Sequence, residues 1–433
     1  MRLKLRHRSE IMAIAVPAII SNITTPLLTL ADTAIAGHLG SAVYLGAIAV
    51  GGSMFNMLYW LCNFLRMGSS GLTAQAYGAA DNAAAARILY RALVVALLLA
   101  AAMLACRGPI ASGILRFMDA DDATQTLARR YFEICIFGAP AVMATLAING
   151  WLLGMQNSKA TMWIAIFTNV VNISVSLSLV YLAGWKIEGV ATGTTVAQWA
   201  GALLGALIIL FRYRPHIPAP REIFERHAFI AFFRINTDIM LRTACLVAVT
   251  LWFTHCGASE GTVVLAANAL LLQLFTLFSF FMDGFAFSGE ALAGKFHGAR
   301  RYSSLRSLIS ELMAIGLACA LLFSAIYAFA GEEFLNLLAD DPEVLDTARR
   351  YLPWAIVIPL CGFCAFVWDG ILIGLTRTRI MLASMAIAVA LFFLIYLSLK
   401  HTEGNDALWM AFNAYLMTRG IAEWIIYRLI KNR

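Results

Sequence analysis

An aspartate in the first long apolar stretch is the side chain with the clearest chemistry. Asp32 lies inside residues 27–40, within a run long enough to cross a membrane, where a carboxylate costs several kcal/mol unless it is protonated, paired or hydrated. Upstream polar residues recur at helical spacing and share its helix face: Ser21, Asn22, Thr25 and Thr29. Because such a stripe cannot face lipid, we expect it to face protein or a water-filled cavity. The alternative is a structural polar contact between two helices.

A second polar helix face is expected at Asn169, Asn172 and Ser176, which are spaced by three and four residues. This face could meet the Asp32 stripe. Its amide donors would favour the ionised carboxylate, whereas burial would oppose the charge. Protonation would remove the penalty for burying the charge and allow the helix to repack.

Two prolines, Pro17 and Pro26, precede Asp32 in the same predicted helix. Each removes a hydrogen bond inside the helix, which makes a bend there energetically easy. We therefore hypothesise that protonation of Asp32 bends the first helix, collapses a cavity and expels a substrate.

The composition requires a membrane setting for these elements. The chain has 433 residues, of which 61% are hydrophobic and 13% charged, with a mean hydropathy of +0.78, whereas soluble domains carry about 25% charged residues. Apolar segments of about 20 residues or more recur, as in polytopic helical membrane proteins. We predict twelve spans, at residues 11–36, 43–66, 85–107, 131–153, 160–184, 187–211, 229–255, 261–287, 305–330, 350–373, 379–400 and 406–428.

Charge alternates between successive loops. Alternate connections are basic, beginning with the N-terminal segment MRLKLRHRSE, and the others are neutral or acidic. The positive-inside rule then places both termini in the cytoplasm. The basic N-terminus runs directly into a span too long for a signal peptide. Since the basic residues lie in short loops, we expect the lipid bilayer, and not nucleic acid, as the partner of this surface.

The chain repeats itself after 220 residues. Asn149-Gly150 then aligns with Asp369-Gly370, and the motif ARRY occurs at Ala128–Tyr131 and again at Ala348–Tyr351. Six spans separate the repeats, so the halves have parallel orientation. We predict an N-terminal six-helix lobe at residues 1–211, a basic, proline-rich cytoplasmic linker at 212–228 and a C-terminal six-helix lobe at 229–433. Two such bundles are typical of transporters that expose a substrate alternately.

Several further charges lie within predicted spans. Asp238 and Arg242 stand four residues apart, and we interpret them as an internal salt bridge, with a role in a substrate or proton path as the alternative. For Asp283, a structural role and a functional role are both left open. Asp369 replaces Asn149 of the other half, and this asymmetry favours a functional carboxylate.

Two more sets of charged residues are interpreted as structural. Arg419 and Glu423 form a second pair at a spacing of four residues. We expect Glu290 to be solvated or paired with Lys295.

The ordered motifs resemble the multidrug and toxic compound extrusion (MATE) family, and within it the DNA-damage-inducible F (DinF-like) branch. The resemblance covers essentially the whole chain and is carried by the segment from Pro17 to Gly40, GLTAQAYGA and EALAGKFHGA after spans two and eight, NTDIMLR at Asn236–Arg242, MDGFAFSGEA at Met282–Ala291, FVWDGILIGLTRTR at Phe366–Arg379 and Thr418-Arg419-Gly420.

The resemblance implies a V-shaped, all-α fold of two pseudo-symmetric six-helix bundles in a bacterial inner membrane. It also implies export of organic, often cationic or amphipathic, compounds in exchange for H⁺ or Na⁺, by a monomer without a cofactor. The family's first-span carboxylate corresponds to Asp32, and its sixth-span threonine to Thr194. The fifth-span Asn-x-x-x-Asp pair corresponds to Asn172 and Ser176. The lost carboxylate weakens Na⁺ coordination but leaves a one-proton carrier intact.

Two other classes of function are weighed against an antiporter. A flippase for a lipid-linked precursor would need several cations in its cavity for a diphosphate, whereas the deep arginines are few and Arg242 already faces Asp238. An intramembrane enzyme is disfavoured because no HExxH motif occurs. No histidine or cysteine cluster predicts a metal site.

Overall fold

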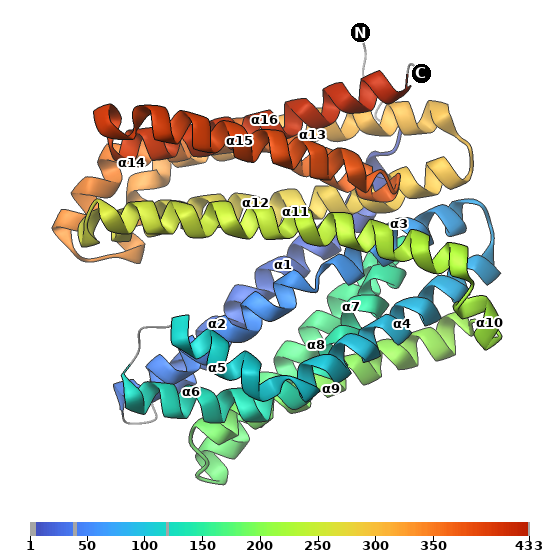
Figure 1. Cartoon of the computed structure of the whole chain (residues 1–433), viewed down its shortest axis with the longest axis horizontal. Helices are drawn as coiled ribbons and strands as arrows, with labels where there is room; N and C mark the ends of the chain where they lie inside the picture. Colours follow the sequence, from blue (N-terminus) through green and yellow to red (C-terminus); the bar gives the residue numbers. More distant parts are fainter. Residues whose placement is uncertain (1–5, 38–40, 118–120, 432–433) are drawn as a thin grey trace. The chain divides into compact units, whose positions relative to one another are not determined.

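The computed structural model describes residues 6–37, 41–117 and 121–431. These residues form helices and no strand (Figure 1). In chain order the α-helices are α1 (Arg8–Gly37), α2 (Ala42–Leu61), α3 (Phe64–Gly78), α4 (Asn82–Ala105), α5 (Arg107–Phe117), α6 (Asp122–Cys135), α7 (Ala139–Gly154), α8 (Ser158–Leu177), α9 (Ile187–Ile208), α10 (Pro220–Ile223), α11 (Arg226–Ser259), α12 (Thr262–Gly298), α13 (Tyr302–Leu338), α14 (Pro342–Gly374), α15 (Thr378–Glu403) and α16 (Asn405–Lys431).

Within the described residues, ten helical segments are long and apolar enough to cross a membrane. Two of them are pairs of consecutive helices, α2 with α3 and α6 with α7. The helices α1 and α16 are 30 and 27 residues long, and at 1.5 Å per residue they also exceed the thickness of the hydrocarbon layer. The predicted twelve-helix membrane fold is therefore confirmed.

The break between α6 and α7 has a local cause. A short 3₁₀ segment, Ile136–Gly138, separates the two helices, and Pro140 stands in the first turn of α7. Proline has no amide hydrogen, and its ring clashes with the carbonyl four residues earlier, which is that of Ile136. The regular α-helix is therefore interrupted at this point, although α6 and α7 together form one candidate span.

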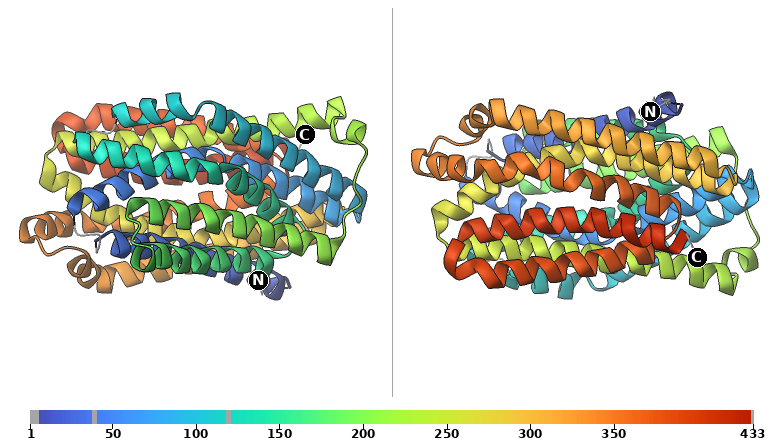
Figure 2. Two further views of the ribbon diagram at one scale, coloured as in Figure 1. Left: turned by 90° about the horizontal axis from the view of Figure 1, so that it is seen from below. Right: turned by 90° about the horizontal axis from the view of Figure 1, so that it is seen from above.

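Two compact units make up the chain. The N-terminal unit is Val16–Asn236, and the C-terminal unit is Thr237–Arg433 with the described part of Met1–Ala15. Within the C-terminal unit, α15 runs beside α16 and α13 beside α14 (Figure 2). The lobe boundaries at residues 211 and 229 stay a prediction. The boundaries of the two units instead fall inside the helices α1 and α11.

The first turns of α1 thus belong to the C-terminal unit, and the first turns of α11 belong to the N-terminal unit. We call this arrangement the exchange of first turns. In the C-terminal unit, the Ile11 carbonyl accepts a 2.9 Å hydrogen bond from Ser288, and the buried Glu311 carboxylate accepts from the backbone amides of Arg6 and His7 at 3.1 and 2.9 Å. In the N-terminal unit, Phe232 of α11 is 1% exposed within the core. Since residues 6–15 and 226–235 are related by the 220-residue repeat, the exchange is reciprocal.

The repeat is also visible in the packing of glycines. A Cβ atom at Gly150 of α7 would collide with the carbonyl oxygen of Arg66 in α3, and one at Gly370 of α14 would collide with that of Ala286 in α12. Both residues of the second pair lie 220 positions after those of the first. The same close backbone contact therefore forms in each half, as expected for two pseudo-symmetric bundles.

Replacing Gly370 by alanine is expected to destabilise the protein by about 1–3 kcal/mol, because the backbone of α12 must move to relieve overpacking. Thermal unfolding of the purified protein measures this change. Gly52→Ala is the matched control, since a Cβ there meets no atom within 4 Å. Equal melting temperatures for the two variants would contradict the close contact.

Candidate functional site

Asp32 lies on α1 in the N-terminal unit, where its side chain is partly buried. Its Oδ1 atom is buried and has no hydrogen-bond partner among the described residues. Nor does any ion pair hold the carboxylate within that part of the chain. The Asp32 side chain is therefore neither fully exposed nor paired with a guanidinium group of the described residues.

The second polar face lies on α8, as predicted. Asn172 is 1% exposed and donates a 3.1 Å hydrogen bond to Thr194 Oγ1 of α9, so these two predicted site residues do meet. Ser176 is fully buried. Asn172 Oδ1 and Ser176 Oγ, like Asp32 Oδ1, have no partner in the described residues. Two of these atoms are acceptors only, whereas the Ser176 hydroxyl group can both donate and accept.

Asn169 connects α8 with α1. Its Nδ2 donates to the Thr24 carbonyl at 3.1 Å, so α8 contacts the backbone of α1 beside the predicted stripe, and the meeting of the two polar faces stays a prediction. The side chains of Thr25 and Thr29, which belong to the predicted stripe, lie outside the described part, as do His38–Gly40 of the first-span motif.

Tyr131 on α6 was missed by the sequence analysis. It lies within electrostatic reach of Asp32, and its hydroxyl is hydrogen-bonded with Thr194. Tyr131 and Asn172 therefore meet at the same hydroxyl group, that of Thr194. The signal was available, because Tyr131 ends the repeated ARRY motif, but that motif was used only to align the halves.

Both prolines predicted to bend the first helix lie inside α1, which is continuous from Arg8 to Gly37. Pro17 follows the unit boundary at Ala15 by two residues. Asn149, on α7, has a buried Oδ1 atom without a partner in the described residues.

The predicted salt bridge between Asp238 and Arg242 is wrong. Arg242 instead pairs with Asp369 of α14, and Asp238 accepts a 2.8 Å hydrogen bond from Thr378 of α15. Arg242 is 6% exposed and Asp369 is 7% exposed, whereas Asp238 is only half-buried. A buried guanidinium gains most from an equally buried counter-ion, because water screens neither charge.

Asp369 is also the hydrogen-bond partner of Arg419, at 2.8 Å, so Arg419 does not simply pair with Glu423 as expected. Glu290, expected to be solvated or paired with Lys295, is 1% exposed, and the Lys295 ammonium lies 3.5 Å from Glu10.

Asp283 is half-buried on α12. The described residues contain no group of three or more histidine, cysteine or acidic side chains that could bind a metal ion.

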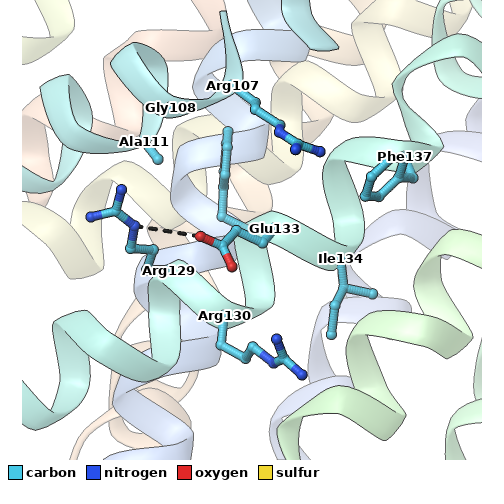
Figure 3. Close-up of a pocket in the computed structure, with 9 residues that line it drawn as sticks. Arg107, Gly108, Ala111, Arg129, Arg130, Glu133, Ile134 and Phe137 are labelled. Atoms are coloured by element: carbon cyan, nitrogen blue, oxygen red, sulfur yellow. Dashed lines mark ion pairs between the residues drawn. The ribbon is translucent and has the colours of Figure 1, made fainter. Parts of the chain in front are cut away.

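A pocket of about 520 Å³ opens between α5 and α6 of the N-terminal unit (Figure 3). Its charged lining residues are Arg107, Arg129, Arg130 and Glu133. Arg129 lies 3.5 Å from Glu133, and Arg130 lies 3.7 Å from Glu188. None of the predicted site residues lines this pocket, so the candidate ion site and the pocket are separate features.

The comparisons with known proteins agree with this architecture. The MatE family model matches residues 17–177 and 238–397, one block in each half. The chain is 38% identical over 417 residues to DNA damage-inducible protein F of Escherichia coli (strain K12), covering 96% of this chain and 91% of the relative. It is 24% identical over 385 residues to the probable multidrug resistance protein NorM of Geobacillus kaustophilus (strain HTA426), covering 84% and 82%.

Among solved structures, the fold is similar to that of a MATE protein crystallised in a bent conformation. The TM-score is 0.87 at 18% sequence identity, and the match covers 99% of this chain and 96% of that chain. The two blocks matched by the family model contain Asp32, Asn172 and Asp369. The chain therefore belongs to the MatE family, the multidrug and toxic compound extrusion transporters.

Proposed function

We propose that this transporter exports amphipathic, often cationic, organic compounds in exchange for protons, with Asp32 as the coupling site. The observation that carries the proposal is the Oδ1 atom of Asp32, a buried acceptor without a donor among the described residues. Protonation of the carboxyl group removes the negative charge that no described donor or cation offsets. Deprotonation restores a charge that favours a wetter or cation-bound environment.

The oxygen ligands available near Asp32 favour H⁺ over Na⁺ as the coupling ion. A sodium ion is best bound by several oxygen ligands that together offset its charge and its lost hydration. On α8, Ser176 supplies a hydroxyl group where a second carboxylate would strengthen such a site, and Asn172 supplies an amide oxygen. A proton needs only one carboxylate and a path to water.

The attachment of α1 supports bending as the response. The first turns of α1 are bound to the C-terminal unit through Glu311, Ser288 and Lys295, whereas the helix beyond Ala15 belongs to the N-terminal unit. Pro17 and Pro26 lie in this second part, where they weaken the helix. A change of charge at Asp32 therefore acts on a helix that is fixed at one end and weakened beyond it.

We place the protein in a bacterial inner membrane with both termini in the cytoplasm, as a monomer whose substrate path lies within one chain. The basic loops support this orientation through the positive-inside rule. Export of a lipid-linked precursor is disfavoured, because the buried guanidinium groups of Arg242 and Arg419 are both engaged by Asp369 and are not available to a diphosphate.

An imposed pH gradient is expected to drive efflux by the purified protein, and a sodium gradient is not. Ethidium efflux from proteoliposomes of the wild-type protein, with ΔpH or ΔNa⁺ imposed separately at equal membrane potential, tests this. Protein-free liposomes correct for passive leak of ethidium. Efflux driven by ΔNa⁺ at constant pH would contradict proton coupling.

A further inference from the structure

Four charged side chains form a buried cluster in the C-terminal unit: Arg242 of α11, Asp369 of α14, and Arg419 and Glu423 of α16. Their exposed fractions are 6%, 7%, 3% and 0%. Asp369 Oδ2 accepts from both guanidinium groups, with Arg419 Nη2 at 2.8 Å. Asp369 is therefore a counter-ion for two cations, and its own charge is fixed by them.

The remaining carboxyl oxygens of the cluster lack donors. Glu423 Oε1 accepts a 3.3 Å hydrogen bond from Ser384 of α15, but Glu423 Oε2 and Asp369 Oδ1 are buried without a donor among the described residues. The carboxyl groups of Glu423 and Asp369 lie within hydrogen-bond reach of each other. Two ionised carboxylates are both acceptors only, so a hydrogen bond between them forms only when one of them carries a proton.

The groups around Glu423 oppose one another. Asp369 of α14 is a second carboxyl group near it, and Arg242 of α11 and Arg419 of α16 are the neighbouring cations. Ser384 of α15 is neutral, and Tyr415 of α16 hydrogen-bonds Arg419. With both carboxylates ionised the cluster is formally neutral, and with one proton added it carries a single positive charge.

A proton between the two carboxyl groups is thus favoured by the unsatisfied oxygens and disfavoured by the arginines.

We propose that Asp369 and Glu423 share one exchangeable proton, which gives this transporter a second protonation site in its C-terminal unit. Glu423 is the group that gains and loses the proton, and Asp369 accepts its hydrogen bond while remaining paired with the arginines. Its use in transport rests on the proposed proton coupling, but its existence does not.

Infrared difference spectroscopy of the purified protein during a pH titration tests the proposal. A protonated carboxyl group has a carbonyl stretching band that disappears when the group ionises. We expect a titrating band that is lost in Glu423→Gln and retained in Asp32→Asn. The glutamine amide can donate to Asp369 Oδ1 and keep the cluster folded, so melting temperature serves as the check on structure.

Two further variants separate titration from packing. Glu423→Asp retains a carboxyl group and should restore a titrating band, and Ser384→Ala removes the neutral donor without removing the band. A band that persists unchanged in Glu423→Gln, or one that is lost in Asp32→Asn alone, overturns the proposal. The titration uses neither substrate nor gradient, so its outcome is independent of the ΔpH-driven efflux that tests the proposed function.

Discussion

Asp32→Asn is expected to reduce ΔpH-driven ethidium efflux to the level of protein-free liposomes, while the protein remains folded. Asparagine has nearly the shape of aspartic acid but cannot ionise, so the site is held permanently in a neutral state. Since no ion pair holds Asp32 in the described part of the chain and its Oδ1 atom has no partner there, the substitution breaks no strong contact. Efflux and thermal unfolding are measured on the same preparation.

Glu133→Gln is the matched control for Asp32→Asn. It also removes one carboxylate from the N-terminal unit, but from an exposed position in the pocket between α5 and α6. We expect its efflux to equal that of the wild-type protein. Full efflux in Asp32→Asn at equal protein content would show that the coupling proton is carried elsewhere.

Asp369→Ala is expected to destabilise the protein by about 3–5 kcal/mol, the usual effect of removing one partner from a buried ion pair. Two buried guanidinium groups, those of Arg242 and Arg419, would lose their shared counter-ion. The melting temperature of the purified protein should fall markedly, and the yield of folded protein with it.

Asp238→Ala is the control for this second prediction. Asp238 is also an aspartate near an arginine in sequence, but it is half-buried and accepts from the hydroxyl group of Thr378. Its replacement should lower the melting temperature far less than that of Asp369. If Asp238→Ala lowered the melting temperature more than Asp369→Ala did, the result would support a salt bridge between Asp238 and Arg242. It would contradict the role of Asp369 as the main counter-ion.

The membrane fold was predictable because its signals are repeated and additive. Hydropathy located the spans, and the 220-residue repeat gave the two parallel halves. The ends of the helices were less predictable. α14 begins at Pro342 and α13 continues to Leu338, whereas the apolar segments suggested starts and ends at 350 and 330. Hydropathy detects the part of a helix inside the hydrocarbon layer and not the turns that extend beyond it.

The candidate site was predictable only along single helices. Spacing correctly gathered Asn172 and Ser176 on one face, but it cannot tell which neighbouring helix that face meets. The partner of Arg242 is therefore the instructive error. A residue four positions away shares its helix face, yet Asp369, which is 127 residues distant, is the buried counter-ion. Tyr131 and Glu423 were missed for the same reason, because tertiary packing brings them to their partners.

The exchanged first turns of α1 and α11 have a consequence for biosynthesis. The core of the N-terminal unit includes Phe232, so this unit cannot be completed until the chain has been synthesised through residue 236. The opening turns of α1, made first, must likewise wait for Ser288 and Glu311. The N-terminal unit therefore cannot finish packing while only its own predicted spans have been translated, whereas the segment that the C-terminal unit borrows is already made when its helices emerge.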